Sequence, residues 1–257
     1  MIQHLTAIWK FRHFLFSLVR LDLRQRYRRS AIGIGWSLLQ PIAMATVMVF
    51  VFTSLLGVDR ANYTKTLLLG MAVWGFCRES AVSGCQAFIA HESYIRQSPL
   101  PFALYPLRQV LGHAIHSSIA LAVALAAVVI ADGNLDHLAM LWAVAPVLVL
   151  LFIAGWAVAT IFAFANVYFQ DTQHLLEVGT QILFFLTPII YSANDGIQWF
   201  HKINPVNIFL ELIRRPLAGG ELPDTRVYVY AIIMTAGLIA IASAVLARCQ
   251  KRVVFHL

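Results

Sequence analysis

A cluster of arginines followed by a long uncharged stretch constrains the fold of this chain more than any other feature. Four arginines lie within residues 24–29, and from Ser30 to Val58 the sequence contains no Asp, Glu, Lys or Arg. Such a stretch exceeds the ~20 apolar residues that an α-helix needs to cross a bilayer. Arginines beside a spanning helix hold that end in the cytoplasm, because they resist translocation and attract anionic lipid. The sequence therefore predicts that the chain enters the membrane from the cytoplasmic side.

The composition extends this interpretation to the whole chain. Of 257 residues, 60% are hydrophobic and 12% are charged, which is about half the charged fraction of a soluble domain. The surplus apolar surface must face lipid. The net charge of +7 does not indicate nucleic-acid binding, because many Lys and Arg residues gather before Ser30 and after Leu246, beside the expected membrane entry points. We expect membrane lipids, and no nucleic acid, as partners.

Charge-free windows predict an all-α membrane protein with six transmembrane helices. We place the spans at residues 36–57, 66–90, 109–131, 141–167, 176–193 and 227–247, within a single transmembrane domain of residues 31–257. An even number of spans puts both termini on one side of the membrane. The segments on that side carry about twice as many Lys and Arg residues as the opposite loops, so we expect both termini to be cytoplasmic.

Two further segments are apolar but do not fit a spanning helix. Residues 1–30 mix aromatic and leucine side chains with basic residues, which is typical of a cytoplasmic amphipathic helix on the membrane surface. Residues 195–226 contain two short apolar runs separated by Asn204-Pro205. Irregular backbone at membrane depth is tolerated where protein or a water-filled cavity shields it. The runs predict two short re-entrant or interfacial helices between spans five and six, with an ordinary outer loop as the alternative.

Charged and histidine side chains inside the expected spans need a physical reason. Arg78 and Glu79 interrupt the second span, where a charge costs at least ~2.5–3.5 kcal/mol. Because adjacent helix residues do not face each other, we expect each to find its own partner, on a polar path or at an interhelical contact. His113 and His116 lie one turn apart on the third span, and we interpret them as hydrogen-bonded residues rather than as a metal site.

The motifs of nucleotide and metal chemistry are missing from this chain. It contains no G-x-x-x-x-G-K-[ST] loop to hold nucleotide phosphates and no H-E-x-x-H zinc motif. Its three cysteines lack the spacing of metal ligands. We therefore expect no catalytic site, no metal and no cofactor in the chain itself. Asp171 and His174, between spans four and five, are interpreted first as a local turn and cap and second as a contact surface.

Three motifs, in this order, resemble the membrane permease of type-2 ABC exporters for O-antigen, capsule and teichoic acid polysaccharides. They are residues 23–33 with Trp36–Pro41, residues 74–79 with 93–101, and residues 168–176 continuing to Asn204-Pro205. Gln170 and Gln97 stand where such permeases usually have basic residues, so the resemblance does not extend to the charge at these two positions of an ATPase-facing surface. The resemblance implies six membrane helices, an amphipathic N-terminal helix and two short outer helices.

The same resemblance implies the partners and the cellular location. It implies a homodimer in the bacterial inner membrane, bound to two copies of a separate P-loop ATPase that would hold ATP and Mg. Its substrate would be an undecaprenyl-pyrophosphate-linked glycan that crosses through a channel between the protomers. The alternatives are an ABC-2 exporter of small lipophilic compounds and a membrane-embedded enzyme acting on lipid-linked sugars.

Carried over by position, the resemblance suggests roles for three sets of residues. ATPase coupling is expected of His91, Glu92, Ser93, Tyr94, Ile95 and Arg96, to which we add Asp171 and His174. Contact with the lipid pyrophosphate or headgroups is expected of Arg24, Arg26, Arg28 and Arg29, with plain membrane anchoring as the alternative. Channel lining is expected of polar and aromatic residues on spans one and five, namely Gln40, Thr46, Thr53, Ser54, Gln181, Phe184, Phe185, Thr187 and Tyr191. Packing is the alternative for Phe184 and Phe185.

Overall fold

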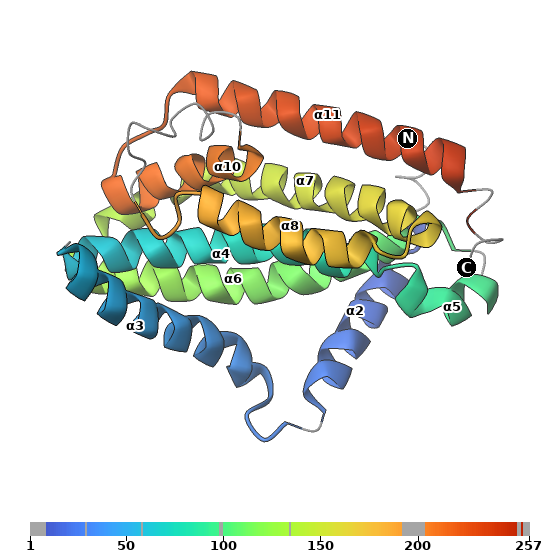
Figure 1. The fold of residues 1–257 in the computed structure, drawn as a ribbon, viewed down its shortest axis with the longest axis horizontal. Coiled ribbons are helices and arrows are strands. Elements are labelled where there is room, and N and C mark those ends of the chain that lie inside the picture. Colours follow the sequence, from blue (N-terminus) through green and yellow to red (C-terminus); the bar gives the residue numbers. More distant parts are fainter. Residues whose placement is uncertain are drawn as a thin grey trace.

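The computed structural model describes residues 9–28, 30–57, 59–97, 100–133, 135–191, 204–250 and 253. In these ranges the regular elements are all helical: α2 (Arg12–Tyr27), α3 (Trp36–Leu56), α4 (Arg60–Cys85), α5 (Glu92–Gln97), α6 (Leu104–Asp132), α7 (Leu141–Tyr168), α8 (Thr172–Leu186), α10 (Pro205–Arg214) and α11 (Thr225–Cys249), with short 3-10 or π-helical turns. The long helices run side by side, and α2 and α3 form a V along one edge (Figure 1).

Among the described residues, four helical segments are long and apolar enough to cross a membrane, which makes the chain a multi-pass membrane protein. They are Trp36–Leu55, Leu104–Asp132, Leu138–Tyr168 and Thr225–Cys249. The other two expected spans differ from these in charge and in length. α4 has 26 residues but includes Arg60, Lys65, Arg78 and Glu79, whereas α8 has only 15 residues. The count of six spans therefore stays a prediction.

The ends of α4, α6 and α8 depart from the expected boundaries for local reasons. α4 begins at Arg60 rather than at residue 66, because Asp59 caps it by accepting from the Asn62 N–H at 2.9 Å. α6 begins at Leu104 rather than at residue 109, so Arg108 lies inside the helix. α8 ends at Leu186 rather than at residue 193. Thr187 precedes Pro188, a position that disfavours helical geometry, and its backbone is extended.

α4 is the central helix of the bundle. It packs against α3, α6, α7, α8 and α10, while α11 packs against α7 and α10. At its contact with α7 the backbones approach closely, since a Cβ added to Gly84 would lie 2.5 Å from the Ala159 Cβ. Small residues at such contacts are typical of helices packed within membranes. The close packing fixes the face of α4 that carries Arg78 and Glu79.

A short helix follows Asn204-Pro205, as the sequence predicts. The Asn204 side chain caps α10 by accepting from the Val206 N–H at 3.0 Å. The apolar face of α10 is buried through Phe209, Leu210, Leu212 and Ile213. The other expected short helix, near residues 197–200, lies outside the described residues. A re-entrant or interfacial position for α10 stays a prediction.

Candidate functional site: a polar cavity among the membrane helices

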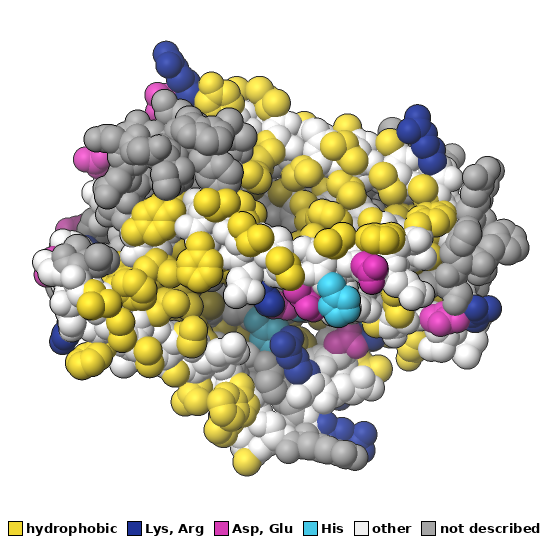
Figure 2. Space-filling view, in the orientation of Figure 1, with side chains coloured by type: hydrophobic (Ala, Val, Ile, Leu, Met, Phe, Trp, Pro, Cys, Tyr) yellow, Lys and Arg dark blue, Asp and Glu magenta, His cyan; other side chains and the backbone are white. Residues whose placement is uncertain are grey.

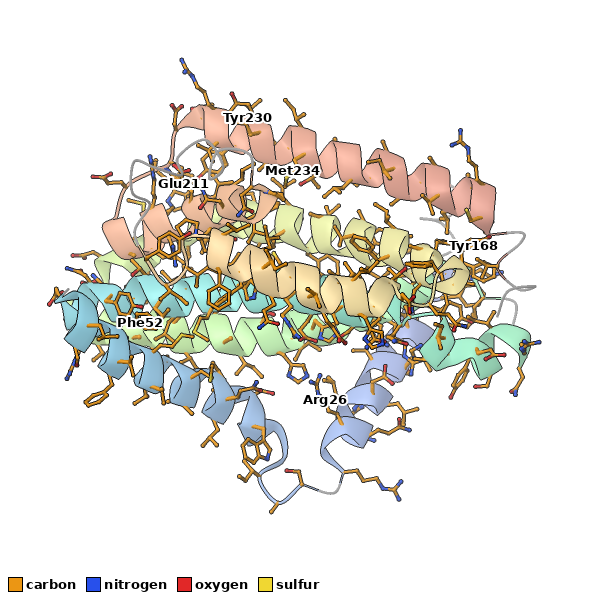
Figure 3. The ribbon with its side chains drawn as sticks, in the orientation of Figure 1. Arg26, Phe52, Tyr168, Glu211, Tyr230 and Met234 are labelled. Atoms are coloured by element: carbon orange, nitrogen blue, oxygen red, sulfur yellow. The ribbon has the colours of Figure 1, made fainter. Side chains whose placement is uncertain are left out.

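A polar cavity of about 420 Å³ lies where α2, α3, α4 and α6 meet. Figure 2 shows charged and histidine side chains gathered in a hollow on a face that is otherwise largely hydrophobic. Arg26 projects from α2 toward the helices behind the V (Figure 3). The polar lining residues are Arg26, Ser37, Gln40, Arg78, Glu79, His113, His116 and Ser117.

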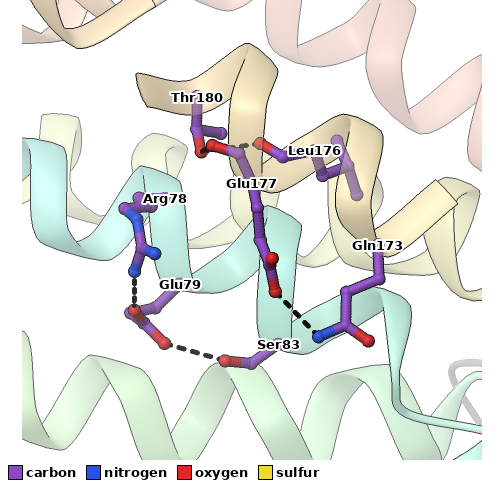
Figure 4. Close-up of polar contacts among 7 residues, drawn as sticks. All are labelled: Arg78, Glu79, Ser83, Gln173, Leu176, Glu177 and Thr180. Atoms are coloured by element: carbon purple, nitrogen blue, oxygen red, sulfur yellow. Dashed lines mark hydrogen bonds and ion pairs between the residues drawn. The ribbon is translucent and has the colours of Figure 1, made fainter. Parts of the chain in front are cut away.

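Arg78 and Glu79 pair with each other in this cavity. Arg78 Nη1 donates to Glu79 Oε1 at 2.5 Å, and the Ser83 hydroxyl donates to Glu79 Oε2 at 2.8 Å (Figure 4). The expectation that each charge would find a separate partner is wrong, because both long side chains bend toward each other from their adjacent positions. The carboxylate of Glu79 is thus neutralised locally, which leaves Arg26 as the surplus charge among the lining Arg and Glu residues.

The two histidines reach the cavity from α6. His116 Nδ1 lies 2.8 Å from the Ser37 hydroxyl, so this histidine joins α6 to α3. His113 is 7% exposed, and its Nε2 has no hydrogen-bond partner among the described residues. An unpaired buried polar group costs about 1–3 kcal/mol. A polar occupant of the cavity would remove that cost.

Of the described arginines that were expected to contact a lipid pyrophosphate, Arg26 is the one that lines the cavity. Arg24 and Arg28 are exposed on or just after α2. Arg29 lies outside the described residues. The described arginines of residues 24–29 therefore differ in orientation, because Arg26 turns toward the membrane helices.

A seam of polar side chains joins α4 to α8 near the cavity. Gln86, directly after α4, donates from Nε2 to Gln173 Oε1. Gln173 Nε2 in turn donates to Glu177 Oε1 at 2.8 Å (Figure 4). No role for Gln173 or Glu177 was predicted from the sequence. Their signal is a spacing of four residues, which puts both on one face of α8.

The residues expected to couple to an ATPase lie at one end of the molecule. His91 ends the 3-10 turn Ile89–His91, residues 92–96 form most of α5, and α8 begins at the same end (Figure 1). Glu92 and Arg96 form an exposed ion pair of 2.8 Å. Ser93 and Tyr94 are also exposed, whereas Ile95 packs against a cluster of buried apolar residues that includes Phe88. Both expected coupling segments thus lie at the same end of the molecule, and their role in coupling stays a prediction.

Asp171 occupies the N-cap position of α8, as expected of a cap residue, but its side chain makes no capping hydrogen bond. His174 is exposed, and its Nδ1 lies 3.7 Å from Glu177 Oε2. Both side chains are thus at the surface of this end, where the alternative interpretation as a contact surface applies.

An ion pair between a buried arginine and a partly exposed aspartate ties α2 to the same end. Arg108 of α6 donates from Nε to Asp22 Oδ2 at 2.6 Å and from Nη2 to Oδ1 at 2.5 Å. The Tyr94 ring lies 5.8 Å from the Arg108 guanidinium carbon. Burial lowers the pKa of nearby His91, although its Nδ1 pairs with the Ala87 carbonyl at 2.9 Å. Asp22 is the one acidic residue before Asp59. Its isolation in a basic segment is the sequence signal from which a specific partner could have been predicted.

At the opposite end, Arg214 fastens α10 to α4 and to the segment after α8. Its guanidinium donates to the carbonyl oxygens of Thr66 at 2.9 Å, Pro188 at 2.5 Å and Ile189 at 3.1 Å. Burial lowers the pKa of Arg214 to about 10, an effect that Tyr63 opposes. Arg214 therefore remains charged at neutral pH and acts as a structural anchor.

The residues expected on the channel wall fall into two groups, one on α3 and one on or just after α8. α3 packs against α4 and α6, whereas α8 packs against α4 and α7. On α3, Gln40 lines the cavity, while the hydroxyls of Thr46, Thr53 and Ser54 donate to carbonyls four residues earlier at 2.6–2.8 Å. These three hydroxyls can still accept hydrogen bonds from an outside group.

On and after α8 the expected channel residues differ in exposure. Gln181 and Phe185 are exposed, Phe184 packs against Trp74 with ring centroids 5.5 Å apart, and the Tyr191 hydroxyl donates to the Phe185 carbonyl at 3.0 Å. Thr187 is completely buried, donates to the Leu183 carbonyl and accepts from Asn204 Nδ2 at 2.8 Å. The expectation that Thr187 lines a channel is therefore wrong, because its side chain anchors Asn204.

Comparison with known proteins adds an independent line of evidence. Residues 13–217 match the family model described as ABC-2 type transporter. The chain is 26% identical over 216 residues to the "O-antigen export system permease protein RfbA" of Klebsiella pneumoniae, covering 81% of this chain and 83% of the relative. It is 26% identical over 197 residues to a protein of the same name from Myxococcus xanthus, covering 76% and 74%.

Proposed function

This chain belongs to the ABC-2 type transporter family, and on this premise we propose that it is the permease subunit of an ATP-driven exporter of a lipid-linked, O-antigen-type polysaccharide. The observation that carries the proposal is the similarity to O-antigen export permeases from two organisms over about three quarters or more of each chain. A polar cavity at the junction of membrane helices supports it, because a hydrated or charged substrate needs such groups along its path.

In this proposal the permease has six spans, with both termini on the cytoplasmic side of the bacterial inner membrane. α4 would be the second span, and its charges are offset within the chain by the Lys65–Asp132 and Arg78–Glu79 pairs. α8 would begin the fifth span, and its polar face would turn toward the protein interior or an aqueous path. The amphipathic helix α2 would lie at the cytoplasmic surface.

The proposed assembly is a homodimer with two copies of a separate ATPase chain that holds ATP and Mg. α5 and the start of α8 would form the contact with the ATPase. A short helix between two spans can transmit closure of the ATPases to both of them. The glycan, linked to undecaprenyl pyrophosphate, would pass along α3 of one protomer and α8 of its partner.

Deletion of the gene tests the transport function directly. A deletion strain should lose surface polysaccharide and retain lipid-linked glycan inside the cell, and the wild-type chain should restore export. Normal surface polysaccharide in the deletion strain would rule out the proposal. Retained export of glycan combined with increased sensitivity to lipophilic compounds would favour the small-molecule exporter instead.

A charge swap tests whether α5 contacts the ATPase. Glu92 and Arg96 pair with each other at 2.8 Å, so the single reversals E92R and R96E break this pair as well as any contact with a partner. The double swap E92R/R96E restores the pair but inverts its direction. We expect all three variants to insert normally and to reduce polysaccharide export several-fold. Export restored by the double swap alone would show that the pair has only an internal role.

A further inference from the structure

We infer that the cavity between α2, α3, α4 and α6 binds the diphosphate group of the lipid carrier, held by Arg26, Arg78 and the two histidines of α6. This inference deepens the proposed function and rests on it for the identity of the carrier. The chemistry that it requires is recognition of a phosphate anion attached to a lipid tail. An ordinary phospholipid headgroup offers related chemistry, so the test below separates the two sources.

The position of the cavity suits a ligand that enters from the membrane surface. Arg26, Trp36 and Gln40 are exposed lining residues, whereas His113 of the same lining is buried. The cavity therefore runs from the surface of the V into the bundle. A lipid carrier can place its diphosphate in such a site while its apolar tail stays beside the exposed side chains of α3, which include Leu39, Ile42 and Val47.

The charge of the lining favours an anion. Two guanidinium groups face one carboxylate, and that carboxylate is already bound by Arg78 and by the Ser83 hydroxyl. Arg78 uses Nη1 for this pair, and a guanidinium has further N–H donors on its other nitrogens. Arginine presents these donors in a planar fork that matches phosphate oxygens.

An unsatisfied buried group supplies an independent indication of a ligand. His113 is more than nine-tenths buried, lines the cavity, and has an Nε2 atom without a hydrogen-bond partner among the described residues. Arg26, Glu79 and His116 all lie within electrostatic reach of it. A phosphate oxygen in the cavity would accept a hydrogen bond from this nitrogen. Packing alone does not explain why this polar atom is buried without a partner.

Binding to the purified permease in phosphatidylcholine nanodiscs tests the inference by native mass spectrometry. The probes are undecaprenyl diphosphate, undecaprenol, which has the same tail without phosphate, and phosphatidylglycerol. We expect undecaprenyl diphosphate to bind at least about 10-fold more tightly than either of the others, because charge-assisted hydrogen bonds carry the difference. Equal binding of undecaprenol would overturn the site, and equal binding of phosphatidylglycerol would overturn its assignment to the carrier.

Variants locate the binding to this cavity. R26Q should weaken binding of undecaprenyl diphosphate about 10-fold, and so should the double variant R78Q/E79Q, which removes both charges of the pair without leaving one unpaired. R20Q is the matched control, since Arg20 is exposed on the same helix and does not line the cavity. An equal loss in R20Q would show that binding reflects the basic surface of α2 instead. Thermal unfolding of each variant checks that it is folded.

Complementation of the deletion strain separates failure of this inference from failure of the proposed function. If the wild-type chain restores export but R26Q and R78Q/E79Q bind the diphosphate as tightly as wild type, the inference fails and the proposed function stands. If the wild-type chain has no role in polysaccharide export, the proposed function fails, whatever the binding measurements give.

Discussion

Three buried or partly buried cations in this protein are held in two different ways, and each way has its own consequence for stability. Lys65 of α4 lies 2.5 Å from Asp132 of α6, and Arg108 is held by Asp22, so these two cations have carboxylate partners. Arg214 instead binds three backbone carbonyls. Removing one partner of a buried pair is costly because it leaves the other charge uncompensated.

The space that Arg214 occupies depends on Gly70, so G70A should destabilise the protein. A Cβ at Gly70 would collide with the guanidinium of Arg214 and would lie 3.2 Å from Ile189 Cγ2. Displacing the guanidinium weakens charge-assisted hydrogen bonds, and we expect a loss of about 2 kcal/mol. For a protein of this size that corresponds to a fall of ~4–8 °C in Tm, measured by thermal unfolding in detergent.

The matched control for this substitution is G112A, also within a long helix. A Cβ at Gly112 meets nothing within 4 Å, and an added Cβ at an unstrained helical position is neutral or slightly stabilising. A Tm of G70A equal to that of G112A would contradict the role given to Arg214.

At the scale of elements, the Asp22–Arg108 pair is the link that should hold α2 on α6. Arg108 is 5% exposed, and D22N would leave its buried guanidinium without a carboxylate. A double-mutant cycle of D22N and R108Q should give a coupling energy of ~1–3 kcal/mol in thermal unfolding. D22N should also make α2 more susceptible to trypsin at Arg24 and Arg26.

The exposed pair Glu92–Arg96 provides the control for this cycle. It has a similar distance of 2.8 Å, but its side chains are 41% and 55% exposed, and an exposed pair on a helix contributes about 0.5 kcal/mol or less. A coupling energy at Asp22–Arg108 as small as that at Glu92–Arg96 would show that α2 is held by its apolar contacts alone.

The elements that the sequence predicts well are those bounded by their own composition. α3, α7 and α11 lie within two residues of the expected spans because apolar runs end at charges or turns. The start of α4 was placed too late because Lys65 was taken to lie outside the helix, whereas Asp59 caps the helix at Arg60 and Lys65, inside it, pairs with Asp132, which is far away in the sequence. Such a partner cannot be found from periodicity, since the contact depends on how α4 packs on α6.

The candidate site was predictable residue by residue but not as one place. Arg26, Gln40, Arg78 and Glu79 stood out in the sequence because each is polar near or within an apolar segment. Their meeting with His113 depends on four helices packing together, which a single sequence does not specify. The pairing of Arg78 with Glu79 was also not predicted, because adjacent residues on a helix point in different directions. It forms because the two long side chains bend toward each other.

At the scale of the whole molecule, α11 makes the orientation of the protein testable. Its 25 residues are long enough to cross the ~30 Å hydrocarbon core, so Asp224 and Gln250 should lie on opposite sides. In a background without Cys77, Cys85 and Cys249, D224C should react with an impermeant thiol reagent in intact spheroplasts. Q250C should react only after permeabilisation. The reverse pattern would invert the proposed topology.

The arrangement of α3 and α8 leads to a final prediction about the path of the substrate. These helices have different neighbours within one chain, since α3 packs against α4 and α6 whereas α8 packs against α4 and α7. Both carry exposed residues, with Val47 61% exposed on α3 and Ile182 57% exposed on α8. A two-fold dimer would use the same surfaces twice, setting α3 of one protomer beside α8 of its partner.

We therefore expect cysteine pairs that join α3 to the partner's α8 to form a disulfide across the dimer and to block polysaccharide export until the disulfide is reduced. Gln40, Thr46 and Val47 are suitable positions on α3, and Gln181 and Ile182 are suitable on α8. A cysteine at Ile233, which is exposed on α11 away from both helices, is the control and should neither crosslink to α3 nor affect export. Normal export by crosslinked dimers would mean that the glycan does not pass between α3 and α8. Crosslinking of α3 to α11 instead would place the dimer contact between these two helices and rule out the pairing of α3 with α8.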